Sequence, residues 1–557
     1  MSCISQLREK ASKDSHKMRL LAIQKSSALM GMIMAVIALV LLLPVISVGL
    51  ALFNPAPWSS ISSSYLGNTL LLMAMVGALT ALIGVCCAWL VTIYEFPGRQ
   101  WLSWALVLPI AIPAYINAYT YADLLEFYGP VQSFIRSSFG YEYQDYWFPS
   151  IRNLPGAAII LSFALYPYVY LLSRAAFLNQ SQTQWWAARS LGASSLAAFF
   201  KIALPSARPA IAGGVALVLM ETLADFGVAD FFSVQTFSVG IFRNWLILGN
   251  KGAALKLAAL MLMFVFILVL FETATRKGQT ASHGRKAAQT ERAQLTGLGR
   301  WSTCFVCFIP VLLGLLIPVT RLLYHAVSTG DPFTSTNLIG YLTNSVSLAV
   351  IVGMIVMALA LILTWVKHNY PSRLNLTWMR LATLGYALPG ALLAVGLLAP
   401  LLVLDHSLTQ KLKAVFGWDG GLILTGTIIA LVYALTIRFL TIAYTGLEAG
   451  FSNIPRSMDH AARSLNATRG RRMGRIILPL LRPSLISAFT LVFIDVMREL
   501  PATLIMRPFN FDTLATRVYW LASDERLPEA STAALMIIGV GLVSTFILNV
   551  FLVKKTI

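Results

Sequence analysis

The chain has 557 residues, of which 57% are hydrophobic and only 12% are charged. A soluble domain carries about 25% charged residues, so this composition excludes an ordinary soluble protein and indicates an integral membrane protein. The formal net charge is +19, but the basic residues gather in short polar segments between apolar runs, which argues against nucleic acid as a partner.

Apolar runs of about 20 residues, each long enough to cross a lipid bilayer as a helix, recur from one end of the chain to the other. They predict an all-α protein with about 12 transmembrane helices in two six-helix repeats. The first six spans are expected at 28–52, 68–93, 102–122, 155–176, 209–232 and 252–272. The second six are expected at 302–325, 342–366, 379–404, 421–445, 483–507 and 531–553.

Basic residues are concentrated in the N-terminal tail, in the segment Arg276–Arg300 and at Lys554 and Lys555. Twelve spans would place all of them on one side of the membrane. Because cytoplasmic segments carry an excess of Lys and Arg, both termini and the central segment are predicted to be cytoplasmic. The first apolar run is expected to remain in the membrane as an anchor.

The polar segment in the middle of the chain has no apolar periodicity and is interpreted as a flexible linker between two halves. The predicted organisation is a basic cytoplasmic tail at 1–27, a first repeat at 28–275 with its core at 66–272, a cytoplasmic linker at 276–300, and a second repeat at 301–557 with its core at 342–553. The histidines and cysteines show no spacing typical of metal ligands, so we expect no stable metal site and no bound cofactor.

One polar interruption between apolar runs occurs twice. Trp186–Pro205 reads WAARSLGASSLAAFFKIALP, and 274 positions later His460–Pro479 reads HAARSLNATRGRRMGRIILP. An internal repeat of this kind indicates a duplicated architecture. Elsewhere Pro113, in LPIAIPAY, matches Pro389, in YALPGALL. Because the elements recur in the same order with six spans in each half, the halves are predicted to be parallel repeats.

The repeated loop contains elements that favour a defined structure. The Ala-Ala pair offers a small surface for close helix packing. Gly192 adopts a positive φ angle at little cost, and Asn466 is the next best residue for such a turn. Pro205 and Pro479 are expected to end a second short helix before the chain re-enters the membrane. An amphipathic loop lying on the bilayer surface is the alternative, and the twofold occurrence of the pattern argues against it.

At these residues the chain resembles the permease subunits of type I ABC importers. Their cytoplasmic signature is Glu-Ala-Ala, three residues, Gly, nine residues and Ile-x-Leu-Pro, and both loops match its spacing. The chain departs from it at Trp186 and His460, in place of Glu, and at Asn466, in place of the second Gly. The residues that the resemblance assigns to ATPase coupling are Trp186, Ala187, Ala188, Arg189, Gly192, Ile202, Leu204, Pro205, His460, Ala461, Ala462, Arg463, Asn466, Ile476, Leu478 and Pro479.

The resemblance implies that each loop docks on one subunit of a separate, homodimeric ABC ATPase, which uses ATP and Mg²⁺. The chain contains no G-x-x-x-x-G-K-[ST] phosphate-binding loop. We therefore expect a transport subunit that is not itself an enzyme.

Acidic residues recur at matching places after the two loops. Glu221 and Asp225, and again Asp495 and Glu499, are four residues apart and share a helix face. Ionisable groups inside a membrane span are costly and are functional hypotheses by default. Four carboxylates around a shared axis would line a path that attracts a cation with a preference for hard oxygen ligands. The alternative is structural pairing, for example with Arg498.

Further segments resemble the fused ferric-iron importer permeases: Leu108–Tyr119, Thr236–Leu246, Ala387–Leu398, Arg498–Pro508 and Thr513–Leu527. This resemblance implies a multi-pass protein of the bacterial cytoplasmic (inner) membrane, embedded in the lipid bilayer, that receives ferric iron from a periplasmic substrate-binding protein. The acidic, aromatic loop Tyr141–Trp147 and the segment Ser523–Glu529 are the expected landing surface for that protein.

Several alternatives stay open at this point. Thiamine, phosphonate or a polyamine would suit the same importer architecture, and the acids would also attract an organic cation. A proton-coupled secondary transporter has a similar number of spans in two parallel halves, but it would not need the repeated loops. A membrane enzyme is disfavoured because no nucleophile–base pair or metal triad is evident.

Overall fold

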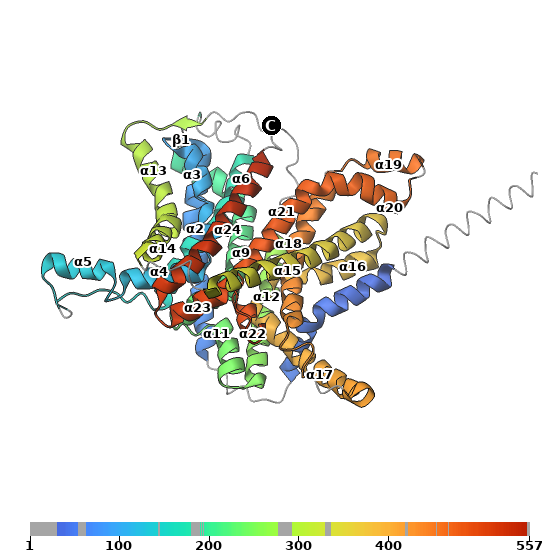
Figure 1. Cartoon of the computed structure of the whole chain (residues 1–557). Helices are drawn as coiled ribbons and strands as arrows, with labels where there is room; N and C mark the ends of the chain where they lie inside the picture. Colours follow the sequence, from blue (N-terminus) through green and yellow to red (C-terminus); the bar gives the residue numbers. More distant parts are fainter. Residues whose placement is uncertain are drawn as a thin grey trace, which may run out of the picture.

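The computed structural model describes residues 30–53, 63–142, 145–179, 190, 192, 194–276, 292–328, 336–417, 421–452, 454–465 and 467–553. Over these residues the chain is almost entirely helical, which confirms the predicted all-α membrane class (Figure 1). Two short strands in the described ranges, β1 (Tyr94–Glu95) and β2 (Ala293–Gln294), pair in parallel and attach the end of the linker to the first half.

The helices of the first half are the helix Met30–Phe53, α2 (Ser63–Ile93), α3 (Arg99–Ala105), α4 (Ala114–Leu125), α5 (Pro130–Phe139), α6 (Leu154–Asn179), α8 (Ser195–Ala198), α9 (Leu204–Ala224), α10 (Gly227–Phe231), α11 (Phe237–Phe242) and α12 (Lys251–Arg276). Those of the second half are α13 (Leu298–Val311), α14 (Ile317–Ser328), α15 (Thr336–Asn369), α16 (Arg373–Ala382), α17 (Gly390–Phe416), α18 (Ile428–Ser452), α19 (Arg456–Ser464), α20 (Arg469–Arg472), α21 (Leu478–Met497), α22 (Pro501–Met506), α23 (Leu514–Ser523) and α24 (Leu527–Val553).

Eleven helices among the described residues are long and apolar enough to cross a membrane. A twelfth span is obtained if the segments Arg99–Ala111 and Ala114–Phe139, which meet at an angle of 93°, are counted as one broken span. This agrees with the expected number of about 12, so the chain is a multi-pass membrane protein.

Corresponding helices pack together in the two halves: α2, α6 and α9 contact one another in the first, and α15, α18 and α21 do so in the second. Matching hydrogen bonds tie the loops to these cores. The Phe237 amide donates to Thr69 Oγ1 (3.2 Å), and the Leu514 amide donates to Ser345 Oγ (2.8 Å). The two halves therefore repeat one another in packing as well as in sequence.

The first helix of each half crosses to the other half. Helix Met30–Phe53 packs on the second half, where Tyr433 donates a hydrogen bond to the Val40 carbonyl. A Cβ added at Gly396 in α17 would lie 2.8 Å from Val48, so only glycine allows this close approach. Conversely, α13 and α14 pack against α2, α3 and α4, and Tyr121 donates to the Leu313 carbonyl (2.6 Å).

Several predicted spans have other boundaries in the structure; the span predicted at 421–445, for example, is α18, which begins and ends seven residues later. The spans predicted at 102–122 and 379–404 are broken by Pro113 and Pro389, which precede α4 and α17. The residues before these prolines, Ile112 and Leu388, are extended, because a proline ring disfavours the helical conformation of the residue that precedes it. The spans predicted at 209–232 and 483–507 end earlier, at Ala224 and Met497, because the backbone leaves the helical conformation before α10 and α22.

The expectation that Pro205 and Pro479 end short helices is wrong. In each half a π-helical turn, Phe199–Ala203 or Met473–Ile477, leads without a break into the membrane-spanning helix. Each proline lies in the first turn of the α-helix that follows, where a missing amide hydrogen is tolerated. The helix therefore continues from the repeated loop to the acidic residues.

Candidate functional site

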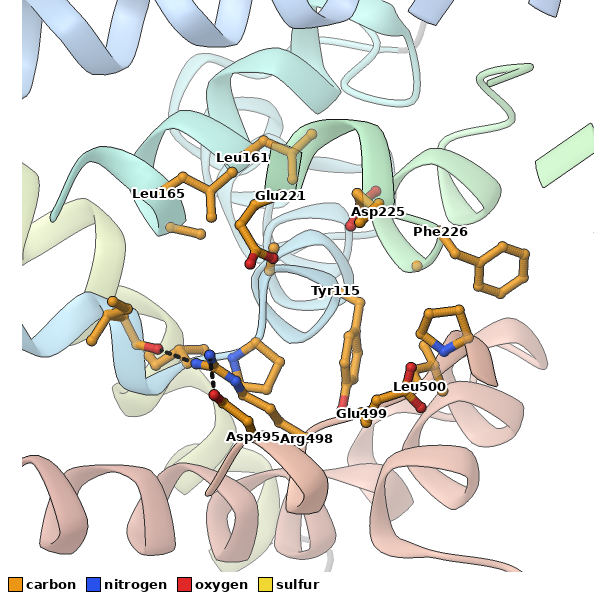
Figure 2. A pocket seen from close by; sticks show the side chains of 18 of the residues that line it. Tyr115, Leu161, Leu165, Glu221, Asp225, Phe226, Asp495, Arg498, Glu499 and Leu500 are labelled. Atoms are coloured by element: carbon orange, nitrogen blue, oxygen red, sulfur yellow. Dashed lines mark hydrogen bonds and ion pairs between the residues drawn. The ribbon is translucent and has the colours of Figure 1, made fainter. Parts of the chain in front are cut away.

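The four acidic residues singled out from the sequence line one cavity between the two halves, with a volume of about 160 Å³. Glu221 and Asp225 lie at the end of α9, and Asp495 and Glu499 lie at the end of α21 (Figure 2). The cavity also contains groups that the sequence analysis did not assign to the path, namely Tyr115, Tyr168, Arg438 and Arg498.

The second-half acid Asp495 is part of an ion pair. Its Oδ1 lies 2.5 Å from Arg498 Nη2, one turn further along the same helix. Nη1 of the same guanidinium donates to the Ile110 carbonyl of the first half (2.9 Å). Asp495 therefore holds an arginine that ties the two halves together at the cavity wall.

Glu499 is the most enclosed of the four acids, with only 2% of its side chain exposed. Its Oε1 lies 3.3 Å from Arg438 Nη1 and accepts the Ala502 amide (3.0 Å). Its Oε2 accepts the amide and the hydroxyl of Thr503 (3.0 and 2.9 Å). Glu499 thus caps α22, and each of its oxygens accepts hydrogen bonds from the start of that helix.

A glycine makes room for this second-half ion pair. A Cβ added at Gly390 would lie 2.4 Å from Arg438 Nη1 and 2.5 Å from Glu499 Oε1. Any larger residue at the start of α17 would push the pair apart.

The first-half acids have fewer partners. Asp225 accepts the Ala229 amide at Oδ2 (3.1 Å) and caps α10, as Glu499 caps α22. The Glu221 carboxylate makes no hydrogen bond or ion pair with any residue in the described part of the chain. In Figure 2 it points into the cavity, toward Arg498.

The difference between the halves comes from two positions. With the 274-residue offset of the repeat, Arg438 corresponds to Ala164 and Arg498 to Ala224, and all four residues line the cavity. The second half therefore supplies both arginines and the first half neither. Four carboxylates against two guanidinium groups give the lining a formal charge of −2.

Tyr115, in α4, also belongs to this site. Its side chain is buried, with 6% of its surface exposed, and its hydroxyl has no hydrogen-bond partner in the described ranges. The second-half counterpart, counted from the matching prolines that precede α4 and α17, is Ala391. Arg438 could have been identified from the sequence as an ionisable residue inside an apolar run, but no sequence signal distinguishes Tyr115 from other buried tyrosines.

Beyond the cavity, further polar contacts join the two halves. Tyr519 of α23 donates to Asp230 of α10 (2.7 Å), and the Tyr519 ring packs 5.7 Å from that of Phe226, which lines the cavity. Arg152 lies 3.4 Å from Glu525.

The structure describes only part of the repeated loops. Trp186 to Arg189 and Asn466 lie outside the described residues. Gly192 has a φ of 85°, as its turn position predicts. In the second loop, His460 to Arg463 belong to α19, where Ala462 is buried and Ala461 is exposed. Helices α19 and α20 project from the same end of the molecule as β1 (Figure 1).

The two loops that the sequence predicts to face outward are described in part. Residues 143–144 of the predicted landing surface lie outside the described ranges. Trp147 is 86% exposed, and Arg526 is paired with Glu529 (2.6 Å) in the other loop. In the part of the chain that the structure describes, no three His, Cys, Asp or Glu side chains are placed to hold a metal ion.

The chain is similar to known membrane components of transport systems. Residues 358–557 match the family described as binding-protein-dependent transport system inner membrane component. The Fe(3+)-transport system permease protein FbpB 2 of Haemophilus influenzae is 25% identical, over 88% of this chain and 90% of that protein. The putative ferric transport system permease protein FbpB 1 of the same organism is 24% identical, over 82% of this chain and 72% of that protein. The sulfate transport system permease protein CysT of Salmonella typhimurium is 30% identical, over 30% of this chain and 57% of that protein.

Proposed function

Since the chain belongs to the inner-membrane components of binding-protein-dependent transport systems, as a fused permease of the type I ABC importers, we propose that its substrate is ferric iron. Permeases of this family work with an ATPase and with a periplasmic binding protein. In the proposed cycle, iron leaves its binding protein, enters the cavity between the halves and is released to the cytoplasm when ATP hydrolysis moves the repeated loops.

The observation that carries the choice of substrate is the charge of the cavity. Its lining has four carboxylates and two arginines, so it attracts a cation and repels an anion such as sulfate or a phosphonate. Carboxylate and phenol oxygens are hard ligands that suit a hard metal ion. Two relatives that align with most of this chain carry ferric transport in their names, which supports the same choice.

The size of the cavity favours a metal ion over a larger organic cation as the substrate. Its volume is about 160 Å³, whereas pockets for drug-sized molecules usually measure about 300–1,000 Å³. A partly hydrated metal ion suits this space better than thiamine does. A polyamine is thin enough to enter, so it is the alternative that an experiment has to address.

The repeated loops support the coupling part of the proposal. In each half one continuous helix runs from the loop region through a π-helical turn to the acids of the cavity. A push on a loop by an ATPase subunit would therefore be transmitted along a rigid rod to the substrate path. Two loops suit a homodimeric ATPase, with one subunit on each loop, in a permease of the inner membrane whose termini face the cytoplasm.

The direct test is transport by the reconstituted complex. Proteoliposomes that contain the chain, its ATPase and its iron-loaded binding protein should accumulate radioactive iron when ATP is supplied. Excess spermidine, thiamine or sulfate should not reduce this uptake. Uptake of one of these compounds in place of iron would overturn the choice of substrate but not the family.

A further inference from the structure

We propose that three arginines at one end of the first half, Arg99, Arg174 and Arg292, bind the phosphate group of an anionic lipid. This arginine cluster lies beside β1, at the end of the molecule from which α19 and α20 project (Figure 1). It is separate from the cavity between the halves. The inference therefore does not depend on which substrate the permease carries.

The arginine cluster is assembled from three separate parts of the chain. Arg99 is the first residue of α3, which follows β1 after a short loop. Arg174 lies near the end of α6, which packs along α2, the helix that leads into β1. Arg292 directly precedes β2, whose pairing with β1 brings the end of the linker to the first half. Secondary and tertiary structure thus hold the three basic residues in one region.

One carboxylate serves all three arginines. Glu95 Oε2 lies 2.9 Å from Arg99 Nε and 3.6 Å from Arg292 Nη1. Arg174 makes no hydrogen bond or ion pair with the part of the chain that the structure describes, although its charge acts on Arg292. Three guanidinium groups against one carboxylate give the cluster a formal charge of +2.

Arg292 carries two further signs that an anion is missing from the cluster. Its Nε atom is buried and has no hydrogen-bond partner in the described ranges, which is uncommon for a buried polar atom. Partial burial and the guanidinium group of Arg99, followed by that of Arg174, lower the pKa of Arg292, and Glu95 offsets only part of this effect. A phosphate group would accept the free hydrogen bond and relieve the repulsion, because guanidinium groups bind phosphate oxygens through paired, charge-assisted hydrogen bonds.

The surroundings of the cluster point to a lipid as the source of the phosphate. Trp101 and Trp104 follow Arg99 on α3, and Trp301 lies on α13, which packs against α3; all three indole side chains are exposed. Arg99 and Leu298 begin segments that are apolar enough to enter a membrane. Tryptophan is enriched at the level of lipid headgroups, and basic pockets between membrane helices at this level bind anionic headgroups.

The second half has no equivalent cluster. With the 274-residue offset of the repeat, Glu95 corresponds to Asn369 and Arg174 to Glu448. Glu448 is paired with Lys367 at 2.5 Å. At this end of the second half, a carboxylate and an ammonium group therefore compensate one another within the chain, and no external anion is required.

Lipid binding by the full-length permease tests the proposal. The purified protein would be titrated with phosphatidylglycerol, and native mass spectrometry would count the bound lipids. Arg174→Gln should weaken binding about fivefold, the effect expected for one basic residue near a membrane surface. The matched control Arg373→Gln removes an exposed arginine at the second-half position equivalent to Arg99 and should leave binding within about twofold of the parental value. Equal binding by the two variants would overturn the proposal.

A charge reversal separates loss of binding from loss of folding. Arg174→Glu introduces the residue type of the second half and lowers the formal charge of the cluster to zero, so it should abolish binding of phosphatidylglycerol. The new carboxylate lies near two arginines, so without anionic lipid this variant should unfold at or above the parental temperature. If it does so and still binds the lipid as the parental protein does, the arginine cluster is not the lipid site.

Inorganic phosphate distinguishes a lipid site from a site for a soluble anion. In phosphatidylcholine nanodiscs, added phosphatidylglycerol should raise the unfolding temperature of the parental permease but not that of Arg174→Glu. Inorganic phosphate should not reproduce this effect, because it has no acyl chains to lie beside the exposed tryptophans. If phosphate alone stabilises the parental permease as much as the lipid does, the cluster binds a soluble anion and the assignment to a lipid is wrong.

Discussion

The two halves of the cavity are built from corresponding helices and have opposite electrostatic arrangements. Each half ends a long helix with two acids four residues apart, and in each the second acid caps a short helix. In the second half both acids are neutralised by arginines, whereas alanines stand at the equivalent positions of the first. After the duplication, two substitutions are therefore enough to make one wall of the cavity charged and the other neutral, while the fold is retained.

The largest effect should follow from breaking the second-half arrangement. Arg438→Met leaves Glu499 buried without its partner and should lower the free energy of unfolding by about 3–5 kcal/mol, measured by denaturation of the purified permease. Arg438→Met combined with Glu499→Gln removes both charges and should recover most of that loss. In the first half, Asp225→Asn keeps an oxygen for the cap and should cost less than about 1 kcal/mol. Equal losses for the two single variants would contradict the difference between the halves.

The second largest effect is expected when the first half is given an arginine of its own. Ala224→Arg places a guanidinium group at the position equivalent to Arg498 and should reduce iron uptake about fiftyfold, because it pairs with Glu221 and repels the ion. Ala224→Gln is the control, since it adds a long polar side chain without charge, and we expect it to reduce uptake less. Similar uptake by the two variants would show that bulk, and not charge, governs entry.

The repeated loops offer a third comparison between the halves. Gly192 has a φ of 85°, so Gly192→Val forces a β-branched residue into the left-handed region and should lower substrate-stimulated ATP hydrolysis about tenfold. Asn466→Val should have a milder effect. Normal stimulation by the substrate-loaded binding protein in the Gly192→Val complex would exclude this loop from coupling.

The smallest effect concerns the two loops that are predicted to face outward. The segments Tyr141–Trp147 and Ser523–Glu529 carry acidic residues, so raising the salt concentration should weaken docking of the binding protein about threefold, because exposed charges are screened over about 8 Å at physiological ionic strength. Surface plasmon resonance at several salt concentrations would measure this. Docking that is independent of salt would indicate that the aromatic residues only mark the membrane interface.

Much of the architecture was accessible from the sequence because hydrophobic length and internal repetition are strong signals. The convergence of Glu221 and Asp495 on one cavity followed from their equal distance from the repeated loops. The ion pair between Arg438 and Glu499 did not, since it joins helices 61 positions apart in the chain. The sequence pattern identifies a charged residue that is costly to bury, but not the neighbour whose opposite charge compensates it.

The helix boundaries that were predicted wrongly also have physical reasons that a sequence pattern does not show. Apolar composition continues through Pro113 and Pro389, so a hydropathy pattern cannot show that the helices break there. Pro205 and Pro479 appeared to end helices because a proline normally interrupts the hydrogen-bond pattern, and the π-helical turns that accommodate them have no sequence signature. The packing of the first helix of each half on the other half depends on tertiary contacts alone, so no sequence pattern predicts it.

That exchange has a consequence for how the protein is made. The hydrogen bond from Tyr433 to Val40 joins residues 393 positions apart, and at about 5–20 residues per second a ribosome needs about 20–80 s to synthesise that length. Throughout this time the face of helix Met30–Phe53 that later packs on the second half has lipid as its neighbour, which costs little because acyl chains are as apolar as its own side chains. Its docking is therefore a late event of co-translational assembly, and a ribosome that stops after the first half leaves this helix without its partner.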